Sequence, residues 1–363
     1  MKIGFVGDIS LNNRYNALYK LGEQPFSAVT EVLGAANYVV GNLECLSEGV
    51  EENLLKRPRL KTEKQTLNFL ASLNMGAVTL AHNHVYDNCI EGFVNTTEVL
   101  DNLKIRYLGA GIEPRKAKES IMLSQTPKIA LLNYVHTDTN PNLPPDADVF
   151  LNYFDLEQAS SDIQELKLEG ALVFVSLHWG GGSEGRYFPD WEQRIIARQL
   201  IEAGADLIVG HHSHTLQPFE IYRGRYVFYS LGNFCFDDVS FENKIYAIKR
   251  PSGTESAILT VHIDSNSNIT PELIPINKDH DLRHYRDSNV LMKVRNRQVL
   301  FKVIFSHKLI WSSYLFFSRT LSPIARYFFG GNVSFLEQVK SINFTKVMTY
   351  FAYLRRVLVG GKN

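Results

Sequence analysis

Short apolar runs that end in polar side chains recur along the first two thirds of the chain. Runs of this length are typical of buried β-strands, and they lie at residues 3–6, 38–40, 77–81, 129–135, 171–177 and 207–209. Between most of them, apolar residues follow a helical spacing, at residues 62–73, 92–103, 156–168 and 191–203. Strands that alternate with helices predict an α/β fold.

The rhythm changes after residue 215, where strands follow one another without long helices between them. We predict strands at residues 219–222, 226–229, 257–263 and 269–274, which can form a second sheet stacked on the first. Gly224 between the first two of these strands indicates a hairpin turn. Residues 235–256 are polar and receive no assignment.

From about Asn289 the pattern becomes helical and rich in Phe, Tyr, Leu, Lys and Arg, with breaks at Pro323 and Gly330-Gly331. The chain has no net charge overall, yet from residue 283 onward 14 Lys and Arg face only 2 Asp and Glu. The preceding residues therefore carry the opposite excess. We predict a main domain over residues 1–285 and a basic, aromatic helical extension over residues 286–363, with different partners.

The polar groups at the strand ends share one chemistry. Together they hold six of the eleven histidines and two carboxylates, in the strings Gly7-Asp8, Asn42-Leu43-Glu44, His82-Asn83-His84, His178-Trp179-Gly180 and Gly210-His211-His212-Ser213-His214. Taken singly, each has an ordinary structural explanation, such as a local turn or a satisfied core histidine. Five such strings at equivalent strand ends predict a metal site, because α/β proteins bind ligands at the carboxyl ends of strands. Carboxylate, amide and imidazole donors suit Mn, Fe, Mg or Zn.

The spacing also predicts individual roles for some of these side chains. His212 and His214 alternate in an apparently extended segment, so both can face one metal centre, and His211 is then expected to point away. His84 can donate a proton, since an imidazole titrates near neutrality. Asp87 can orient a histidine or cap the helix that follows, and the sequence favours neither role.

The strings resemble the CapA-type capsule synthesis family, which is related to the poly-γ-glutamate biosynthesis protein and belongs to the calcineurin-like metallophosphoesterase superfamily. The resemblance runs from about residue 1 to about residue 240. Besides the strings above, it rests on Ala81 and Leu177 before two of them, on Asp87, on residues 204–214, and on Tyr229-Ser230-Leu231-Gly232-Asn233-Phe234.

The resemblance implies an α/β fold of the metallophosphoesterase type, a four-layer αββα sandwich, here with a C-terminal helical extension. It implies two divalent metal ions held by Asp8, Glu44, Asn83, His178, His212 and His214, with His84 as general acid. The outer shell or substrate contacts would be Asn42, His82, Asp87, His211 and Asn233. The chain departs from the family pattern at His82, where the family usually has Asn, and at Asp87-Asn88-Cys89, where it tends to have Asp-Tyr-Gly. It also has Ser10 where many metallophosphoesterases carry a metal-binding histidine.

Two functions fit these residues. The first is a metal-dependent hydrolase that cleaves a phosphoester, or an amide or ester of an anionic polymer, in capsule or exopolysaccharide biosynthesis. The second is a non-catalytic, metal-binding component of the same assembly machinery. The expected partner is an anionic polymer or a phosphorylated substrate. Nucleic acid is not expected, because no base-stacking platform or groove-reading motif is visible. A ligase would need a partner, because the chain has no phosphate-binding GxxxxGK[ST] loop.

The three cysteines, Cys45, Cys89 and Cys235, have no CxxC spacing, which argues against a disulfide framework or a thiolate zinc site. No signal peptide opens the sequence, and no run of about 18 uncharged apolar residues occurs. We therefore expect a cytoplasmic protein, or one held at the cytoplasmic face of the membrane.

Residues 291–329 interleave aromatic and apolar side chains with lysines and arginines. One interpretation is a helical appendage with a solvated basic face. The other is a surface for anionic lipid, since each basic residue near such a membrane contributes about 1 kcal/mol. Under the lipid hypothesis, anionic vesicles sediment the full chain at low salt and leave a 1–285 form in solution. If neither form sediments with the vesicles, the lipid hypothesis is contradicted.

Overall fold

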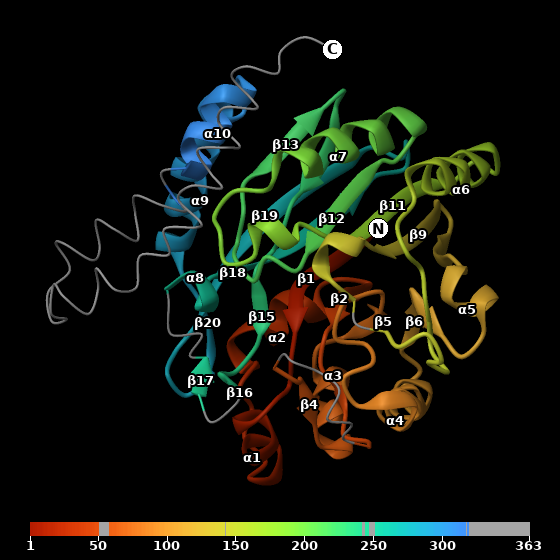
Figure 1. The fold of residues 1–363 in the computed structure, drawn as a ribbon, viewed down its shortest axis with the longest axis vertical. Helices are drawn as coiled ribbons and strands as arrows, with labels where there is room; N and C mark the ends of the chain where they lie inside the picture. The colour runs from red at the N-terminus through yellow and green to blue at the C-terminus, as the bar shows by residue number, and fades with distance from the viewer. Residues whose placement is uncertain (51–57, 142, 242–243, 247–250, 317, 319–363) are drawn as a thin grey trace, which may run out of the picture. The chain divides into compact units, whose positions relative to one another are not determined.

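Two sheets form the centre of the unit Met1–Val299 in the computed structural model (Figure 1). The structure describes residues 1–50, 58–141, 143–241, 244–246, 251–316 and 318. The first sheet has the order β20-β19-β18-β1-β2-β5-β6, with β15 also paired to β1. Its parallel strands are β1 (Lys2–Ile9), β2 (Tyr38–Leu43), β5 (Met75–Thr79), β6 (Arg106–Leu108) and β15 (Asn233–Cys235), and its antiparallel strands are β18 (Ser256–Ile263), β19 (Ile269–Lys278) and β20 (His284–Arg286).

The second sheet has the order β13-β14-β12-β11-β9-β8. Its four central strands run parallel, and its two edge strands are antiparallel to their neighbours. In chain order the strands are β8 (Ile121–Gln125), β9 (Lys128–Val135), β11 (Leu172–His178), β12 (Leu207–His211), β13 (Phe219–Tyr222) and β14 (Arg225–Phe228).

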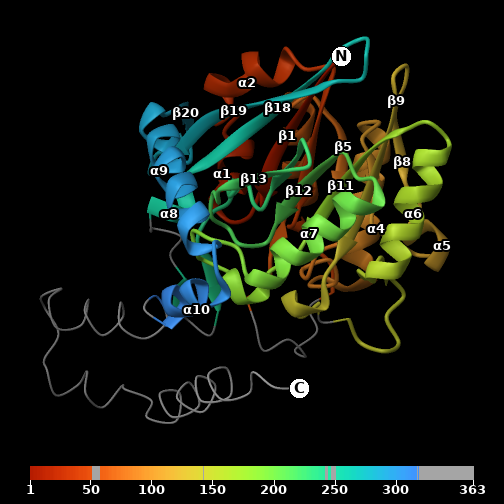
Figure 2. The same cartoon turned by 90° about the horizontal axis from the view of Figure 1, so that it is seen from above.

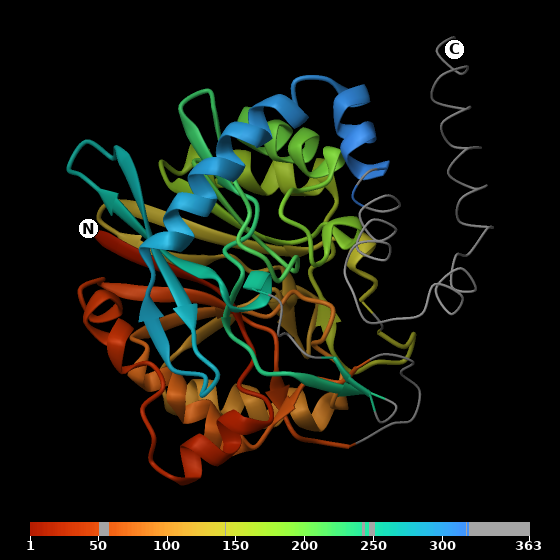
Figure 3. The ribbon, with the colours of Figure 1, turned by 90° about the vertical axis from the view of Figure 1, so that its left-hand side faces the viewer.

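A buried apolar cluster lies between the two sheets, and it includes Phe5 of β1 and Phe174 of β11, whose rings meet edge to face at 6.1 Å. Helices cover the outer faces, as Figure 3 shows, with α2 (Ser27–Gly34) and α4 (Cys89–Asn102) on the first sheet and α6 (Leu156–Leu168) and α7 (Trp191–Ala203) on the second. Strands covered on both faces must be apolar throughout, which explains the continuous apolar runs. The predicted four-layer α/β sandwich is confirmed.

Several local predictions need correction. The helix predicted over residues 62–73 is divided into the short strand β4 (Lys61–Thr62), a 3-10 turn η1 (Lys64–Asn68) and α3 (Phe69–Ser72). Thr62 is tied down, because its hydroxyl donates to the Leu11 carbonyl at 2.6 Å. The strands after residue 215 divide between the two sheets instead of forming one of their own (Figure 2). The hairpin turn at Gly224 is confirmed, with a φ of 74° there.

The remaining elements are short connections and the C-terminal helices. They are the strands β3 (Leu46–Ser47), β7 (Ala110–Gly111), β10 (Phe150–Leu151), β16 (Val239–Phe241) and β17 (Lys244–Tyr246), the 3-10 turns η2 (Thr137–Thr139) and η3 (Gly181–Ser183), and the helices α1 (Arg14–Lys20), α5 (Pro114–Lys118), α8 (Pro251–Thr254), α9 (Ser288–Ile304) and α10 (Lys308–Phe316).

The C-terminal region begins as predicted, with helices. The chain divides into the units Met1–Val299 and Leu300–Asn363, so residues 288–299 of α9 belong to the first unit. The boundary after residue 285 stays a prediction, and the breaks predicted at Pro323 and Gly330-Gly331 lie outside the described residues. Within the described part of the chain, no helix is both long and apolar enough to cross a bilayer.

A buried lysine marks the end of β19. The Lys278 side chain is almost inaccessible, and its ammonium donates to the Phe236 carbonyl at 2.8 Å. Burial lowers the pKa of Lys278 from 10.5 to about 8, since taking a charge out of water disfavours the protonated form.

We expect this lysine to make stability rise with pH. Below its folded pKa of about 8 the cost of burying the ammonium is fully present. Between about pH 8 and the pKa of this lysine in the unfolded chain, the unfolded chain binds a proton that the folded chain does not. The free energy of unfolding of the wild type, relative to Lys278→Met, should therefore increase by about 2 kcal/mol between about pH 7 and about pH 10. Urea unfolding measures this, and a difference that does not change with pH contradicts it.

Candidate metal centre

Strand register brings the predicted site residues to one place. In the first sheet, Asp8 of β1 lies opposite Asn42 of β2 on one side and Asn233 of β15 on the other. In the second sheet, His178 at the end of β11 lies opposite His211 at the end of β12. The carboxyl ends of parallel strands from both sheets therefore supply the side chains, as the sequence predicts.

Gly7 sets the approach between β1 and the loop before β15. A Cβ atom at this position would lie 1.8 Å from the Gly232 carbonyl oxygen, so no larger residue fits. The Asp8 amide donates to that same oxygen at 2.9 Å. The pairing of β1 with β2 also shifts between Val6 and Asp8. This irregularity helps to aim the Asp8 side chain.

Asp8 is completely buried, and one of its two carboxylate oxygens has hydrogen-bond partners. Its Oδ1 accepts from Asn42 Nδ2 at 3.0 Å and lies 3.0 Å from His211 Nδ1. Its Oδ2 has no hydrogen-bond partner among the described residues and lies 3.4 Å from His214 Nδ1. Burial raises the pKa of Asp8, but the His211 and His214 imidazoles outweigh it and lower this pKa well below its usual range.

Glu44, directly after β2, is also completely buried, and its Oε1 has no hydrogen-bond partner in the described structure. This oxygen lies 3.7 Å from His214 Nε2 and 3.9 Å from His178 Nε2. Burial raises the pKa of Glu44 well above its usual range. Burial lowers the pKa of His214, but Glu44 and Asp8 together raise it to about 10. Glu44 and His214 therefore share at least one proton at neutral pH.

A second group of donor atoms faces the same space. His178 Nε2 lies 2.9 Å from Asn83 Oδ1 and 3.1 Å from His212 Nδ1. Burial lowers the pKa of His212 to about 4 and the pKa of His178 well below its usual range, so both imidazoles are neutral and have lone pairs to offer.

The spacing and chemistry of these atoms fit a divalent cation. With metal–nitrogen bonds of about 2.1 Å, tetrahedral ligand atoms lie about 3.4 Å apart, close to the separations found here. Ligand atoms of Glu44, His212 and His214 all lie within 4.8 Å of one another. Two buried carboxylate oxygens without hydrogen bonds are costly unless a positive charge meets them, which the protonated His214 does at 3.4 and 3.7 Å and a bound divalent cation would do in its place. The six predicted ligands are thus brought together, while their roles and the number of metal ions stay predictions.

The backbone of the last motif differs from the extended segment that the sequence suggests. His212 and His214 have φ angles of 89° and 55°, in the left-handed region that favours glycine. Alternation of side chains therefore ends at His211, the last residue of β12. The expectation that His211 points away is wrong, because its imidazole contacts Asp8. Strain of this kind, about 1–3 kcal/mol per residue, is concentrated at functional sites.

His84 and Asp87 form a pair beside the cluster. His84 Nδ1 lies 2.6 Å from Asp87 Oδ2, and the His84 side chain is 13% exposed. Asp87 also accepts from the Leu60 amide at 2.9 Å. The helix α4 begins at Cys89 without a side-chain cap. Of the two roles left open for Asp87, the structure therefore favours orienting a histidine.

Three other predicted or noted residues have clear contacts. His82 is fully buried, burial lowers its pKa to about 3, and its Nδ1 accepts from the His84 amide at 3.1 Å. Asn233 Oδ1 lies 3.0 Å from His214 Nδ1. Ser10, which replaces the metal-binding histidine of the resemblance, donates to Asn12 Oδ1 at 2.8 Å. Its hydroxyl is thus engaged within the chain.

Sequence reasoning missed a polar pair at the end of β9. His136 follows the last residue of this strand, and its Nδ1 lies 3.0 Å from the Asp138 carboxylate. That carboxylate accepts from the Gly180 amide at 3.1 Å, and the His136 amide donates to the His178 carbonyl at 2.9 Å. The strand-end rule that found the other motifs applies here too, since residues 129–135 are a predicted strand.

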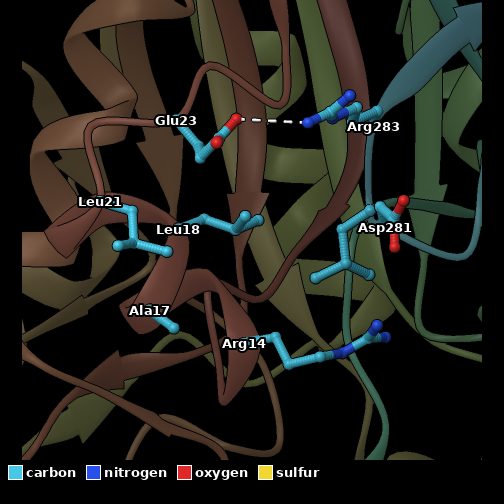
Figure 4. Close-up of a pocket in the computed structure, with 8 residues that line it drawn as sticks. Arg14, Ala17, Leu18, Leu21, Glu23, Asp281 and Arg283 are labelled. Carbon is cyan, nitrogen blue, oxygen red and sulfur yellow. Dashed lines mark hydrogen bonds and ion pairs between the residues drawn. The ribbon is translucent and has the colours of Figure 1, made fainter.

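A hollow of about 280 Å³ lies elsewhere, between α1 and the turn before β20 (Figure 4). Its two arginines already have partners: Arg14 pairs with Asp237 at 2.6 Å, and Arg283 pairs with Glu23 at 3.4 Å. None of the predicted site residues lines it.

Comparison with known proteins agrees with the motifs. A family model described as "Bacterial capsule synthesis protein PGA_cap" matches residues 2–238. The PGA biosynthesis protein CapA of Bacillus subtilis is 29% identical over 85% of this chain and 84% of its own. The capsule biosynthesis protein CapA of Bacillus anthracis is 28% identical over 75% of this chain and 66% of its own. Among solved structures, the sulfate thiohydrolase SoxB of Thermus thermophilus aligns at 13% identity and a TM-score of 0.41, over 84% of this chain and 47% of its own, which is too weak a likeness to support an argument.

Metal binding should release protons. Because Glu44 and His214 hold at least one proton at neutral pH, and a ligand must lose its proton, we expect Mn²⁺ to displace about one proton or more near pH 7. The affinity should accordingly rise with pH towards the His214 pKa of about 10. Calorimetric titrations in PIPES and in Tris, two buffers with different heats of protonation, measure the released protons. Heats that do not depend on the buffer would contradict the assignment, and His214→Gln should reduce the release.

Proposed function

This chain belongs to the family of bacterial capsule synthesis proteins, and we propose that it is a metal-dependent hydrolase of capsule or exopolysaccharide biosynthesis. Its proposed substrate is a phosphoester, or an amide or ester bond of an anionic polymer. One observation carries the proposal: buried oxygens of Asp8 and Glu44 that have no hydrogen bond from the described residues face a group of imidazoles at ligand spacing.

The residues that would hold two divalent cations are Asp8, Glu44, Asn83, His178, His212 and His214. Bound cations would supply Lewis-acid polarisation of the substrate and would make a water molecule acidic enough to react at neutral pH. Asn42 holds two of the ligands in place, because its Nδ2 donates to Asp8 at 3.0 Å and approaches Glu44 Oε2 at 3.5 Å. His211 fixes the other side of the Asp8 carboxylate.

His84 is the proposed proton donor. Asp87 accepts from its Nδ1, which fixes the ring and leaves Nε2 as the atom that can pass a proton. Such a donor helps most when the leaving group is a strong base. An amine from an amide or an alkoxide from an alkyl phosphodiester needs this proton, whereas a nitrophenolate does not. The His84–Asp87 pair therefore supports an amide or an alkyl phosphodiester as the substrate.

The names of the relatives support the substrate class. Two of them are named for PGA and for capsule biosynthesis, and the resemblance of the motifs implies poly-γ-glutamate or a similar anionic polymer. Doubly charged cations can bind the anionic groups of such a polymer.

We expect His84→Asn to reveal the acid through its dependence on the leaving group. With Mn²⁺ present, turnover of an alkyl phosphodiester or an amide of the polymer should fall by about 10²–10⁴-fold. Turnover of bis(p-nitrophenyl) phosphate should fall much less, and the Mn²⁺ affinity should stay unchanged. His280→Asn is the matched control, because His280 is exposed on the surface.

Two outcomes would count against the proposal. An equal loss on both kinds of substrate would remove His84 from the proton-donor role. The hydrolase proposal would fail if the Mn²⁺-loaded protein hydrolysed neither generic phosphodiesters nor the anionic polymer and if His84→Asn left the capsule phenotype intact. The non-catalytic assembly role would then remain.

A further inference from the structure

The helix α9 is joined to the rest of the first unit through a buried carboxylate. Glu255, directly before β18, has a side chain that is only 2% exposed, and both of its oxygens meet cations from α9. Lys293 Nζ lies 2.5 Å from Oε1, and Arg297 Nη2 lies 2.9 Å from Oε2. A buried carboxylate needs such partners, and losing one of them is costly.

Arg297 continues past Glu255 to two loops beside the candidate metal centre. Its Nη1 donates to the Leu216 carbonyl at 3.0 Å, two residues after the predicted ligand His214. Its guanidinium also lies over the Tyr187 ring, 4.0 Å from the ring centre. The planar, five-donor guanidinium can make all three contacts at once, which an ammonium cannot.

Other α9 side chains hold the same segment. Val290 and Val294 are buried against Leu216, together with Ala257 of β18. Further along, the Gln298 amide makes a double contact with Phe219, accepting from its backbone amide at 3.0 Å and donating to its carbonyl. The chain between His214 and β13 is thus fixed to α9 by apolar packing, a charge-assisted hydrogen bond and an amide pair.

The segment that α9 holds directly follows two residues under backbone strain. His212 and His214 both have positive φ angles, which are unfavourable for residues with a Cβ. Such conformations persist only when neighbouring structure fixes them. After β12 the main chain is held partly by other loops, since the Gly185 amide donates to the Ser213 carbonyl at 2.8 Å and the Gln217 amide donates to the Ser230 carbonyl at 3.1 Å. The contacts with α9 are a second source of that support.

We propose that residues 288–299 of α9 form a clamp that positions His212 and His214 for metal binding, with Arg297 as its central positioning residue. This inference rests on the proposed metal centre. Under this inference, metal binding also depends on residues beyond 238, where the family match ends. Arg297 does not touch the predicted ligands. It acts through Leu216 and Tyr187.

The chain contains its own matched control. Lys293 pairs with the same Glu255 carboxylate and its side chain is 43% exposed, and in the described structure it makes no hydrogen bond with Leu216 and no cation–π contact with Tyr187. Lys293→Met therefore removes one charge from Glu255 and leaves the link to the ligand loop. Arg297→Met removes that link, and Arg297→Lys keeps the charge while losing the fork and the ring contact.

The test is a calorimetric titration of the full-length chain with Mn²⁺ for the wild type and these three variants. Groups bonded directly to metal ligands typically change affinity by about 10–100-fold, and Arg297 acts one step further out, so we expect a loss of about tenfold in Arg297→Met and a smaller loss in Arg297→Lys. The Mn²⁺ affinity of Lys293→Met should stay within about twofold of the wild type, because Glu255 keeps Arg297 as a partner and the link to the ligand loop is intact, although losing one cation beside the buried carboxylate should lower the overall stability. Amide hydrogen exchange of the metal-free proteins should rise in residues 212–219 of Arg297→Met, rise less in Arg297→Lys and stay unchanged in Lys293→Met.

The outcomes separate the clamp from the metal centre. Wild-type affinity and unchanged exchange in Arg297→Met would overturn the clamp and leave the metal centre intact. Equal losses in Arg297→Met and Lys293→Met would also overturn it, since the effect would then come from Glu255 and not from the ligand loop. A wild type that does not bind Mn²⁺ would defeat the proposed function, and hydrogen exchange in the metal-free proteins would then decide the clamp by itself.

Discussion

The burial of two carboxylates at the meeting point of two sheets is the constraint on which the rest of the site depends. Asp8 and Glu44 lie out of reach of water, and each keeps one oxygen without a hydrogen bond from the described residues. A buried carboxylate is costly unless polar or charged groups meet it, so groups from both sheets must converge on these two side chains. His214 does so from the second sheet and Asn42 from the first.

This convergence links the fold to the chemistry. Parallel strands deliver their carboxyl ends to one rim, and continuous apolar runs let the strands be covered on both faces. The last ligands come after β12 has ended, on a backbone with positive φ angles at His212 and His214. That strain needs a support outside the sheet, and α9 provides contacts at Leu216 and Phe219.

Much of this arrangement could be predicted from the sequence, and the failures have physical causes. Apolar runs locate the central strands, and polar residues at their ends locate the candidate ligands, because both follow from local patterning. The orientation of His211 could not be predicted, since alternation assumes an extended backbone that ends at that residue. The clamp was missed for another reason. Arg297 and Glu255 are far apart in sequence, and a basic helix resembles a solvated surface until its buried partner is known.

The central claim is that the buried cluster of Asp8, Glu44 and the histidines is a divalent metal centre. A crystal structure of the Mn²⁺-loaded protein, with anomalous data collected on both sides of the manganese absorption edge, tests it most directly. The account predicts anomalous peaks within bonding distance of Glu44, His212 and His214, the three residues whose ligand atoms already lie within 4.8 Å of one another. No manganese peak at this cluster, at Mn²⁺ concentrations that saturate binding in solution, would contradict it.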